Sequence, residues 1–372
     1  MRNSISNQSM LAIILAGFLF SCGDVDSINN EDPINLIIEI SLADDSSGIA
    51  TIKASAENAI MYSLYIDSGE SPVLENTLGE FMHTFIRTGI YQVEVRAFGV
   101  SGRYIREVRQ IEVTVGKDVS VDDGYISSVS YEGYDLTWND EFEGNNIKHE
   151  NWSFETGTGC PNCGWGNNEL QYYRQENAWV GDGVLTIEAR EEKYQSSNYT
   201  SARLITRNLR SFKYGRIDIR ALLPKGQGIW PALWMLGNNL SSVGWPQSGE
   251  IDIMEMVGGG GRENQIHGTI HWDEDGNHAQ TGSGYTLTSG TYADKYHVFS
   301  ILWDESAIKW YIDDTEFYDA SITSENMSEF HQEFFFIFNI AVGGNWPGNP
   351  DSQTVFPQRM KVDYVRVFQK KQ

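Results

Sequence analysis

The run Gly-Glu-Ile-Asp-Ile-Met-Glu at residues 249–255 constrains this chain more than any other segment. Its three acids, Glu250, Asp252 and Glu255, stand among isoleucine and methionine side chains in a strand-like sequence. Burial of an unpaired carboxylate is costly, so a sheet interior does not accept such acids without a cause. A solvated edge strand is the ordinary alternative. The apolar residues between the acids leave little polar periodicity on the second face, and we therefore favour a built acidic site.

The spacing of these acids predicts an irregular strand. Glu250 and Asp252 are two residues apart and share one face of a strand. Glu255 would point the opposite way in a regular strand, as an unpaired acid between two sheets. A β-bulge near Ile253 and Met254 returns it to the shared face, and bulges are common beside active sites. We predict this bulge, with the Met254 side chain in the packing. Two carboxyls on one face are the equipment of a glycosidase.

Composition indicates a large β protein that acts on a neutral partner. The 372 residues are enough for two domains, and 12% aromatic residues with 36 glycines and 9 prolines suit a turn-rich β fold rather than disorder. The formal charge of −24 argues against nucleic acid or an anionic membrane surface as a partner. It argues more weakly against a polyanionic substrate. We expect a monomer whose substrate is a neutral polymer.

The first residues resemble an export signal. Arg2 precedes an apolar run over residues 10–20, which is too short to span a bilayer but fits a signal peptide. The sequence Leu-Phe-Ser-Cys-Gly at residues 19–23 resembles a bacterial lipoprotein box, in which Cys22 is acylated and becomes the mature N-terminus. An ordinary signal peptide cleaved nearby is the alternative. We expect a signal peptide over 1–21, a flexible tether over 22–33, and an exported lipoprotein anchored at the outer membrane or cell surface only through its lipid.

The tryptophan distribution divides the remainder into two domains. All 11 tryptophans follow residue 137. Residues 34–116 contain short alternating strands that suit a small immunoglobulin-like β-sandwich. Within it, residues 65–69, 83–85 and 89–93 resemble a polycystic-kidney-disease (PKD) domain. We interpret it as a spacer, since a sugar-binding face would present tryptophan. We expect a linker over 117–130, then one large β-sandwich over 131–372.

Two cysteines remain after the signal segment. Cys160 and Cys163 are separated by a proline and an asparagine. In an exported protein we expect them to form a local disulfide, with two free thiols as the alternative. A zinc site would need further ligands, and none are nearby.

The acidic run closely resembles the active-site strand of glycoside hydrolase family 16. The resemblance covers essentially the whole second domain. Its motifs together resemble the laminarinase branch of the family, which cuts β-1,3-glucans. Met254 is the extra residue of the bulged form of the family. The implied fold is an all-β jelly-roll sandwich with a concave glycan cleft. The other matching motifs lie at residues 134–142, 164–173, 201–206, 230–236, 266–272, 338–348 and 362–367.

The resemblance implies roles for the three acids. Glu250 is the nucleophile, Glu255 the general acid and base, and Asp252 assists between them. The expected activity is retaining endo-hydrolysis of laminarin-type β-1,3-glucan, without an organic cofactor or catalytic metal. Same-family alternatives are mixed-linkage glucan, agar and carrageenan, although a sulfated substrate should demand basic residues. A non-catalytic glucan sensor is the alternative of another class, but such relatives lose the catalytic glutamates.

Candidates for sugar binding combine aromatic and polar side chains. We expect one or both of Trp230 and Trp234 to be partly core, because they alternate with apolar residues, and Trp245 and Trp346 to be platforms in loops. We expect His271 to form hydrogen bonds beside the carboxylates; a zinc pair with His267 lacks a third ligand. The full set of candidates is Asn168, Glu169, Arg203, Trp230, Trp234, Trp245, His271 and Trp346.

The resemblance also suggests a structural calcium ion away from the cleft. Calcium needs hard oxygen ligands. Our candidate ligands are Glu143, the backbone of Gly183, and Asp363. Ordinary surface hydrogen bonds of these acids are the alternative.

Overall fold

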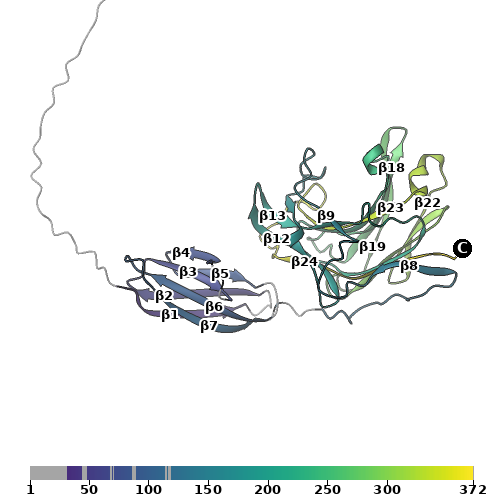
Figure 1. The fold of residues 1–372 in the computed structure, drawn as a ribbon. Coiled ribbons are helices and arrows are strands. Elements are labelled where there is room, and N and C mark those ends of the chain that lie inside the picture. Colours follow the sequence, from purple (N-terminus) through teal and green to yellow (C-terminus); the bar gives the residue numbers. More distant parts are fainter. Residues whose placement is uncertain are drawn as a thin grey trace, which may run out of the picture. The chain divides into compact units, whose positions relative to one another are not determined.

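The computed structural model describes residues 32–43, 48–67, 69, 71–85, 89–113, 115 and 119–371. Figure 1 shows the fold. The expected signal peptide and Cys22 lie outside the described residues. The chain divides into two compact units, residues 1–117 and 118–372. Among the described residues, no helix combines the length and the apolar character needed to cross a membrane.

The first unit is a β-sandwich of two antiparallel sheets around its own core. In β6, Val93, Val95 and Ala97 are fully buried and Ile90 is exposed, which confirms the predicted alternation. In the described part of this unit, one sheet has the order β1 (Ile34–Leu42), β2 (Ile49–Glu57), β5 (Glu80–Thr84). The other has the order β4 (Leu74–Asn76), β3 (Met61–Ile66), β6 (Gly89–Phe98), β7 (Tyr104–Val113).

The second unit consists of two larger sheets, both within residues 119–371. The seven-stranded sheet has the order β19 (Asn277–Thr286), β18 (Gln265–Glu274), β17 (Glu250–Glu255), β16 (Ile229–Gly237), β23 (Phe334–Val342), β14 (Arg203–Ile205), β9 (Ser153–Glu155). The ten-stranded sheet contains β10 (Gln171–Tyr173), β13 (Ser197–Ser201), β12 (Val184–Tyr194), β24 (Gln358–Lys370), β15 (Gly215–Leu222), β20 (His297–Trp303), β21 (Ala307–Ile312) and β22 (Thr315–Ser321) in that order, with β11 (Ala178–Gly181) on β12 and β8 (Tyr134–Asp140) on β24.

Strands dominate this unit, and the prediction of an all-β sandwich is confirmed. The described helical segments are short: η1 (Gln175–Asn177), α1 (Leu240–Val243) and η2 (Glu325–His331). Alternation along β16 explains how the seven-stranded sheet is used. Leu233 and Met235 enter the main core, whereas Trp230 and Trp234 are half-buried on the opposite face. We call this opposite face the site face.

Within the expected linker over 117–130, residues 119–130 belong to the second unit in the structure. Residues 119–130 pack on the second unit, where they satisfy the buried guanidinium of Arg220. Arg220 Nε donates to the carbonyl of Tyr125 at 2.5 Å, and Nη1 donates to the carbonyl of Val121 at 2.6 Å and to Asp363 Oδ2 at 2.7 Å. A buried guanidinium has five N–H donors that need acceptors. The acceptors in residues 119–130 are backbone carbonyls, which any sequence supplies. The side-chain pattern of this segment therefore could not predict its contact with Arg220.

We expect Arg220→Met to destabilise the second unit. The change leaves Asp363 and the carbonyls without their donor, so the free energy of unfolding should fall by about 3 kcal/mol. Urea unfolding followed by tryptophan fluorescence measures this unit alone, because all 11 tryptophans lie in it. Lys370→Met is the matched control, since Lys370 is 60% exposed and lies 3.9 Å from Asp304. An unchanged urea midpoint for Arg220→Met would contradict the assigned role.

Candidate active site

The acidic strand β17 contains the predicted bulge. Asp252 pairs with Thr269 on β18, and Glu255 pairs with His267, so Ile253 and Met254 together lie opposite one residue. Both of their side chains enter the core, with exposed fractions of 1% and 0%. Two consecutive inward side chains return Glu255 to the site face. The predicted irregularity and the packing role of Met254 are therefore confirmed.

The residue opposite the bulge is Gly268, and Trp310 from the other sheet packs against it. A Cβ atom at Gly268 would lie 2.4 Å from Trp310 Cδ1, so only glycine permits this approach. The Trp310 Nε1–H donates to the carbonyl oxygen of Asp252 at 2.8 Å. Trp310 thus fixes the backbone of β17 immediately before the bulge, and the glycine makes that contact sterically feasible.

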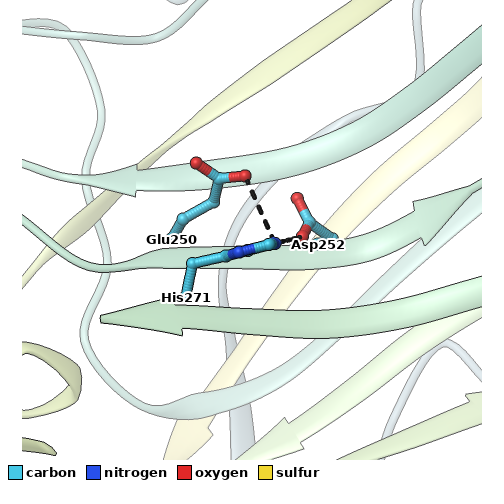
Figure 2. A group of neighbouring side chains, drawn as sticks. All are labelled: Glu250, Asp252 and His271. Atoms are coloured by element: carbon cyan, nitrogen blue, oxygen red, sulfur yellow. Dashed lines mark hydrogen bonds and ion pairs between the residues drawn. The ribbon is translucent and has the colours of Figure 1, made fainter. Parts of the chain in front are cut away.

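Each acid on the site face has its own hydrogen-bonding partner, an indole or an imidazole. Trp245 Nε1 donates to Glu250 Oε2 at 2.8 Å, and Trp230 Nε1 donates to Glu255 Oε1 at 3.0 Å. His271 Nε2 lies 3.1 Å from Asp252 Oδ2 and 3.8 Å from Glu250 Oε1 (Figure 2). His271 was expected beside the carboxylates, and its ring points at two of them.

The surroundings raise the pKa of all three carboxyls. Burial, then the Asp252 carboxylate, raise the pKa of Glu250 to about 8, and burial raises that of Asp252 to about 7. Burial, followed by the charges of Asp252 and Glu250, raises the pKa of Glu255 well above its ordinary range. The cluster therefore retains protons near neutral pH. Glu255, which faces both other carboxylates, is the group that keeps its proton as a general acid must.

Exposed indoles lie at both ends of the acid row. Trp346 is 41% exposed and meets Trp230 edge-to-face at 5.5 Å. Trp245 is 47% exposed and donates to Glu250. Both lie outside the strands, as expected of platforms. Trp234 packs on a small apolar group and is partly core, as expected, while Trp230 instead donates to Glu255.

Arg203 lies on the site face but away from the acids. It belongs to β14, three strands from β17, which corresponds to roughly 14 Å along the sheet. Its guanidinium lies 4.6 Å from the ring centre of Trp165 and 4.8 Å from that of Trp234, and Nε donates to Glu155 Oε2 at 2.7 Å. The Arg203 side chain is 10% exposed, so these contacts hold the two indoles and Glu155 in place on the site face.

Glu169 and Asn168 support loops and do not contact the acids in any described interaction. Glu169 is buried, which raises its pKa, and it accepts hydrogen bonds from Gln171 at 2.6 Å and from Tyr173 at 3.3 Å. Asn168 Nδ2 donates to Asn345 Oδ1 at 2.8 Å, one residue before Trp346. These two residues position the loops that border the site face.

The sequence reasoning missed three residues of the site face. Asn339 accepts from Trp234 Nε1 at 2.7 Å, and it is the lone polar residue of β23. Trp165 stacks on Arg203. His278 lies 2.8 Å from His271 across the β18–β19 hairpin. The Asp275-Gly276 pair is a hairpin signal that could have placed His278 near His271.

Cys160 and Cys163 form a disulfide in the structure. Residues 156–160, Trp165 and Tyr172 line a shallow hollow beside this loop.

The expected calcium positions meet at one edge of β24. Strand β24 has a bulge at Asp363 opposite β15. Arg220 pairs with Tyr364 and the next residue, Ala221, pairs with Val362, so Asp363 has no partner of its own on β15. Strand β12 pairs β24 up to Val362, and β8 pairs it from Val365. Gly183 and residue 143 therefore approach residue 363 from the ends of these two strands, although Asp363 Oδ2 already accepts from Arg220. The backbone placement fits a cation held by oxygen atoms. Within the described residues, only Glu250, Asp252 and His271 bring three possible metal-ligating atoms within 4.8 Å of one another, and we assign this group to the acid chemistry.

Comparisons with known proteins identify the second unit. Residues 162–366 match the family model "Glycosyl hydrolases family 16". The chain belongs to this family. It is therefore a glycoside hydrolase, and family 16 hydrolases need no cofactor for catalysis.

Several similar proteins support the assignment to family 16. The chain is 42% identical over 251 residues to a β-glucanase of Rhodothermus marinus, matching 63% of this chain and 85% of that protein. It is 42% identical over 239 residues to the clotting factor G alpha subunit of Tachypleus tridentatus, but it spans only 34% of that protein. The laminarinase catalytic domain of Thermotoga maritima is similar in structure, with a TM-score of 0.60, 46% identity, and coverage of 65% of this chain and 100% of that domain.

Proposed function

We propose that the second unit hydrolyses internal β-1,3 bonds of laminarin-type glucan with retention of configuration. One observation carries this function: the bulge gathers Glu250, Asp252 and Glu255 on one face, each with its own indole or imidazole partner. The similar solved catalytic domain of Thermotoga maritima is a laminarinase, and the similar protein of Rhodothermus marinus is a β-glucanase. Both support this substrate class.

The geometry supports a double displacement. Glu250 attacks the anomeric carbon and forms a covalent glycosyl ester, while the glycosidic C–O bond breaks and Glu255 gives its proton to the leaving oxygen. Glu255 then takes a proton from water, which attacks the anomeric carbon and releases Glu250. Glu250 and Asp252 share a hydrogen bond, and Glu250, whose pKa is about 8 against about 7 for Asp252, is the partner that holds the shared proton in the free site. Glu250 must therefore pass this proton to Asp252 before it attacks as an ionised nucleophile.

The charge of the site face favours a neutral glucan over sulfated polymers. The seven strands of the sheet that forms this face are all described, and they contain one lysine or arginine, Arg203. Its guanidinium is paired with Glu155. A sulfated galactan would need more cations along its path. A non-catalytic sensor is disfavoured because all three acids are present. Mixed-linkage glucan remains the competing neutral substrate, and a parallel assay on lichenan distinguishes it.

The whole protein is an exported, lipid-anchored enzyme in this proposal. The box ending in Cys22 supplies the anchor, and the first unit acts as a PKD-like spacer between lipid and enzyme. Two features support the spacer role: two sheets with seven described strands, and the lack of tryptophan before residue 138. We propose that the enzyme acts as a monomer and binds one structural calcium ion at Glu143, Gly183 and Asp363.

Glu250→Gln and Glu255→Gln should each remove nearly all turnover of laminarin. The first change removes the nucleophile and the second removes the proton donor, so a loss of at least about 1,000-fold is expected. Glu274→Gln, an exposed change on β18, is the control. NMR of the first products should show the β-anomer; early appearance of the α-anomer would refute the retaining mechanism.

Trp245→Phe and Trp230→Phe should shift opposite limbs of the pH profile. Each change keeps an aromatic ring but removes an N–H that stabilises a carboxylate, so the pKa of the acid rises further. Glu250 must be ionised, so Trp245→Phe should move the acidic limb of kcat/KM to higher pH. Glu255 must be protonated, so Trp230→Phe should move the basic limb to higher pH. Identical profiles for the two variants would show that the acid roles are misassigned.

Mass spectrometry of the mature N-terminus should find diacylglycerol on Cys22. The apolar run and the following Ser-Cys-Gly predict lipid transfer to this thiol before cleavage. Cys22→Ser should release the protein from the membrane fraction. An unmodified N-terminus downstream of residue 22 would refute the anchor.

Calcium should raise the thermal midpoint of the wild-type protein relative to a chelator. Saturation of a site present only in the folded state should add about 5 °C. Asp363→Asn should abolish this difference whatever its own midpoint, whereas Asp351→Asn, in an exposed loop, should keep it. An equal calcium response in Asp363→Asn would exclude this position.

A further inference from the structure

His278 lies at the end of a hydrogen-bonded series that leads to the acids. It belongs to β19, the edge strand of the seven-stranded sheet, and pairs across the hairpin with Asp273. Its Nε2 lies 2.8 Å from His271 Nδ1, and the two rings stack with centroids 5.1 Å apart and an interplanar angle of 21°. The other nitrogen of His271 faces Asp252 at 3.1 Å (Figure 2). His278 therefore contacts the site through His271.

Hydrogen-bond chemistry fixes which nitrogens carry protons. When Asp252 and Glu250 are ionised, His271 Nε2 faces only acceptor oxygens and must carry a hydrogen. In neutral His271, Nδ1 is then an acceptor, and the group 2.8 Å from it must be an N–H donor. Only a hydrogen on His278 Nε2 satisfies this arrangement. Burial, then the positive charge that His271 carries when protonated, lower the pKa of His278, so the ring of His278 stays neutral.

We propose that His278 is a positioning residue: its Nε2–H donates to His271 Nδ1, which holds His271 in the Nε2–H tautomer aimed at Asp252. The effect of His278 on catalysis rests on the hydrolysis proposed above. His271 donates a hydrogen bond that stabilises the Asp252 carboxylate, which also shares a hydrogen bond with Glu250. Without the donor on His278, His271 can adopt the other tautomer and present a lone pair to Asp252.

Among the described interactions, His271 Nδ1 is the hydrogen-bonding partner of His278, and the other polar groups nearby have partners elsewhere. Asp273 on β18 accepts from Gln247 at 2.7 Å and from the backbone N–H of Gly276 at 2.9 Å. Glu329, in η2, accepts from the backbone N–H of Asp273 at 3.3 Å. Trp245 covers the His278 ring at 4.6 Å, and its own N–H is given to Glu250.

Two substitutions separate hydrogen bonding from packing. His278→Phe keeps an aromatic ring against His271 and Trp245 but has no N–H. His278→Gln loses the ring but carries an amide N–H at a similar reach. In the full-length protein, His278→Phe should lower kcat on laminarin by about tenfold, with KM changed by less than about twofold, and should shift the acidic limb to higher pH. His278→Gln should restore most of the activity and the wild-type profile. His149→Phe, an exposed position, is the control.

Nitrogen-15 NMR of histidine-labelled protein tests the tautomer without turnover. The His271 signals, assigned by their loss in His271→Gln, should show Nε2–H in the wild type and in His278→Gln, and a tautomer mixture in His278→Phe. Full activity of His278→Phe with loss in His278→Gln would reduce His278 to a packing residue and overturn the proposal. An unchanged His271 tautomer in His278→Phe would overturn it as well. If the wild type fails to cleave laminarin, the proposed function fails, while the NMR result still decides the tautomer.

Discussion

The site depends on one packing arrangement, the bulge at Ile253 and Met254. Three carboxylates can share a face of β17 only if two consecutive side chains enter the core, and both are fully buried there. The arrangement also needs Gly268 opposite the bulge, because Trp310 occupies the space of a Cβ atom and donates to the carbonyl of Asp252. The chemistry of one face is therefore set by the shape of the core behind it.

The electrostatics of the site follow from the choice of partners. Indole N–H groups and a histidine, not arginines, face the three acids. A guanidinium beside a carboxylate would lower its pKa and leave it ionised, which would remove the general acid. Two indoles and one imidazole orient the carboxyls, while burial and mutual repulsion keep the pKa values high. Arg203, the cation of this face, lies three strands away and is paired with Glu155, so it does not disturb this balance.

Local patterns predicted the features that depend on local periodicity. The spacing of the acids was sufficient to predict the bulge, and alternation predicted the strands of both units. Features set by distant partners could not be predicted this way. Residues 119–130 have no apolar period, and their carbonyls meet Arg220, which lies far along the chain. Glu169 stands in a motif that resembles a sugar-binding one, but its buried contacts with Gln171 and Tyr173 depend on how the loop folds back.

The edge strand β19 shows how a turn can influence chemistry on another strand. The acids lie on β17, two strands away in the sheet. The turn residues Asp275 and Gly276 adopt positive φ values of 54° and 81°, which suit a two-residue hairpin. That turn sets the register in which Asp273 pairs with His278. A shift by one residue would move His278 to the opposite face, away from His271. Because β19 has no further strand of its sheet beyond it, this turn and its pairing with β18 carry the register. The tautomer of His271, and through it the hydrogen bonding of Asp252, thus depends on the conformation of two turn residues.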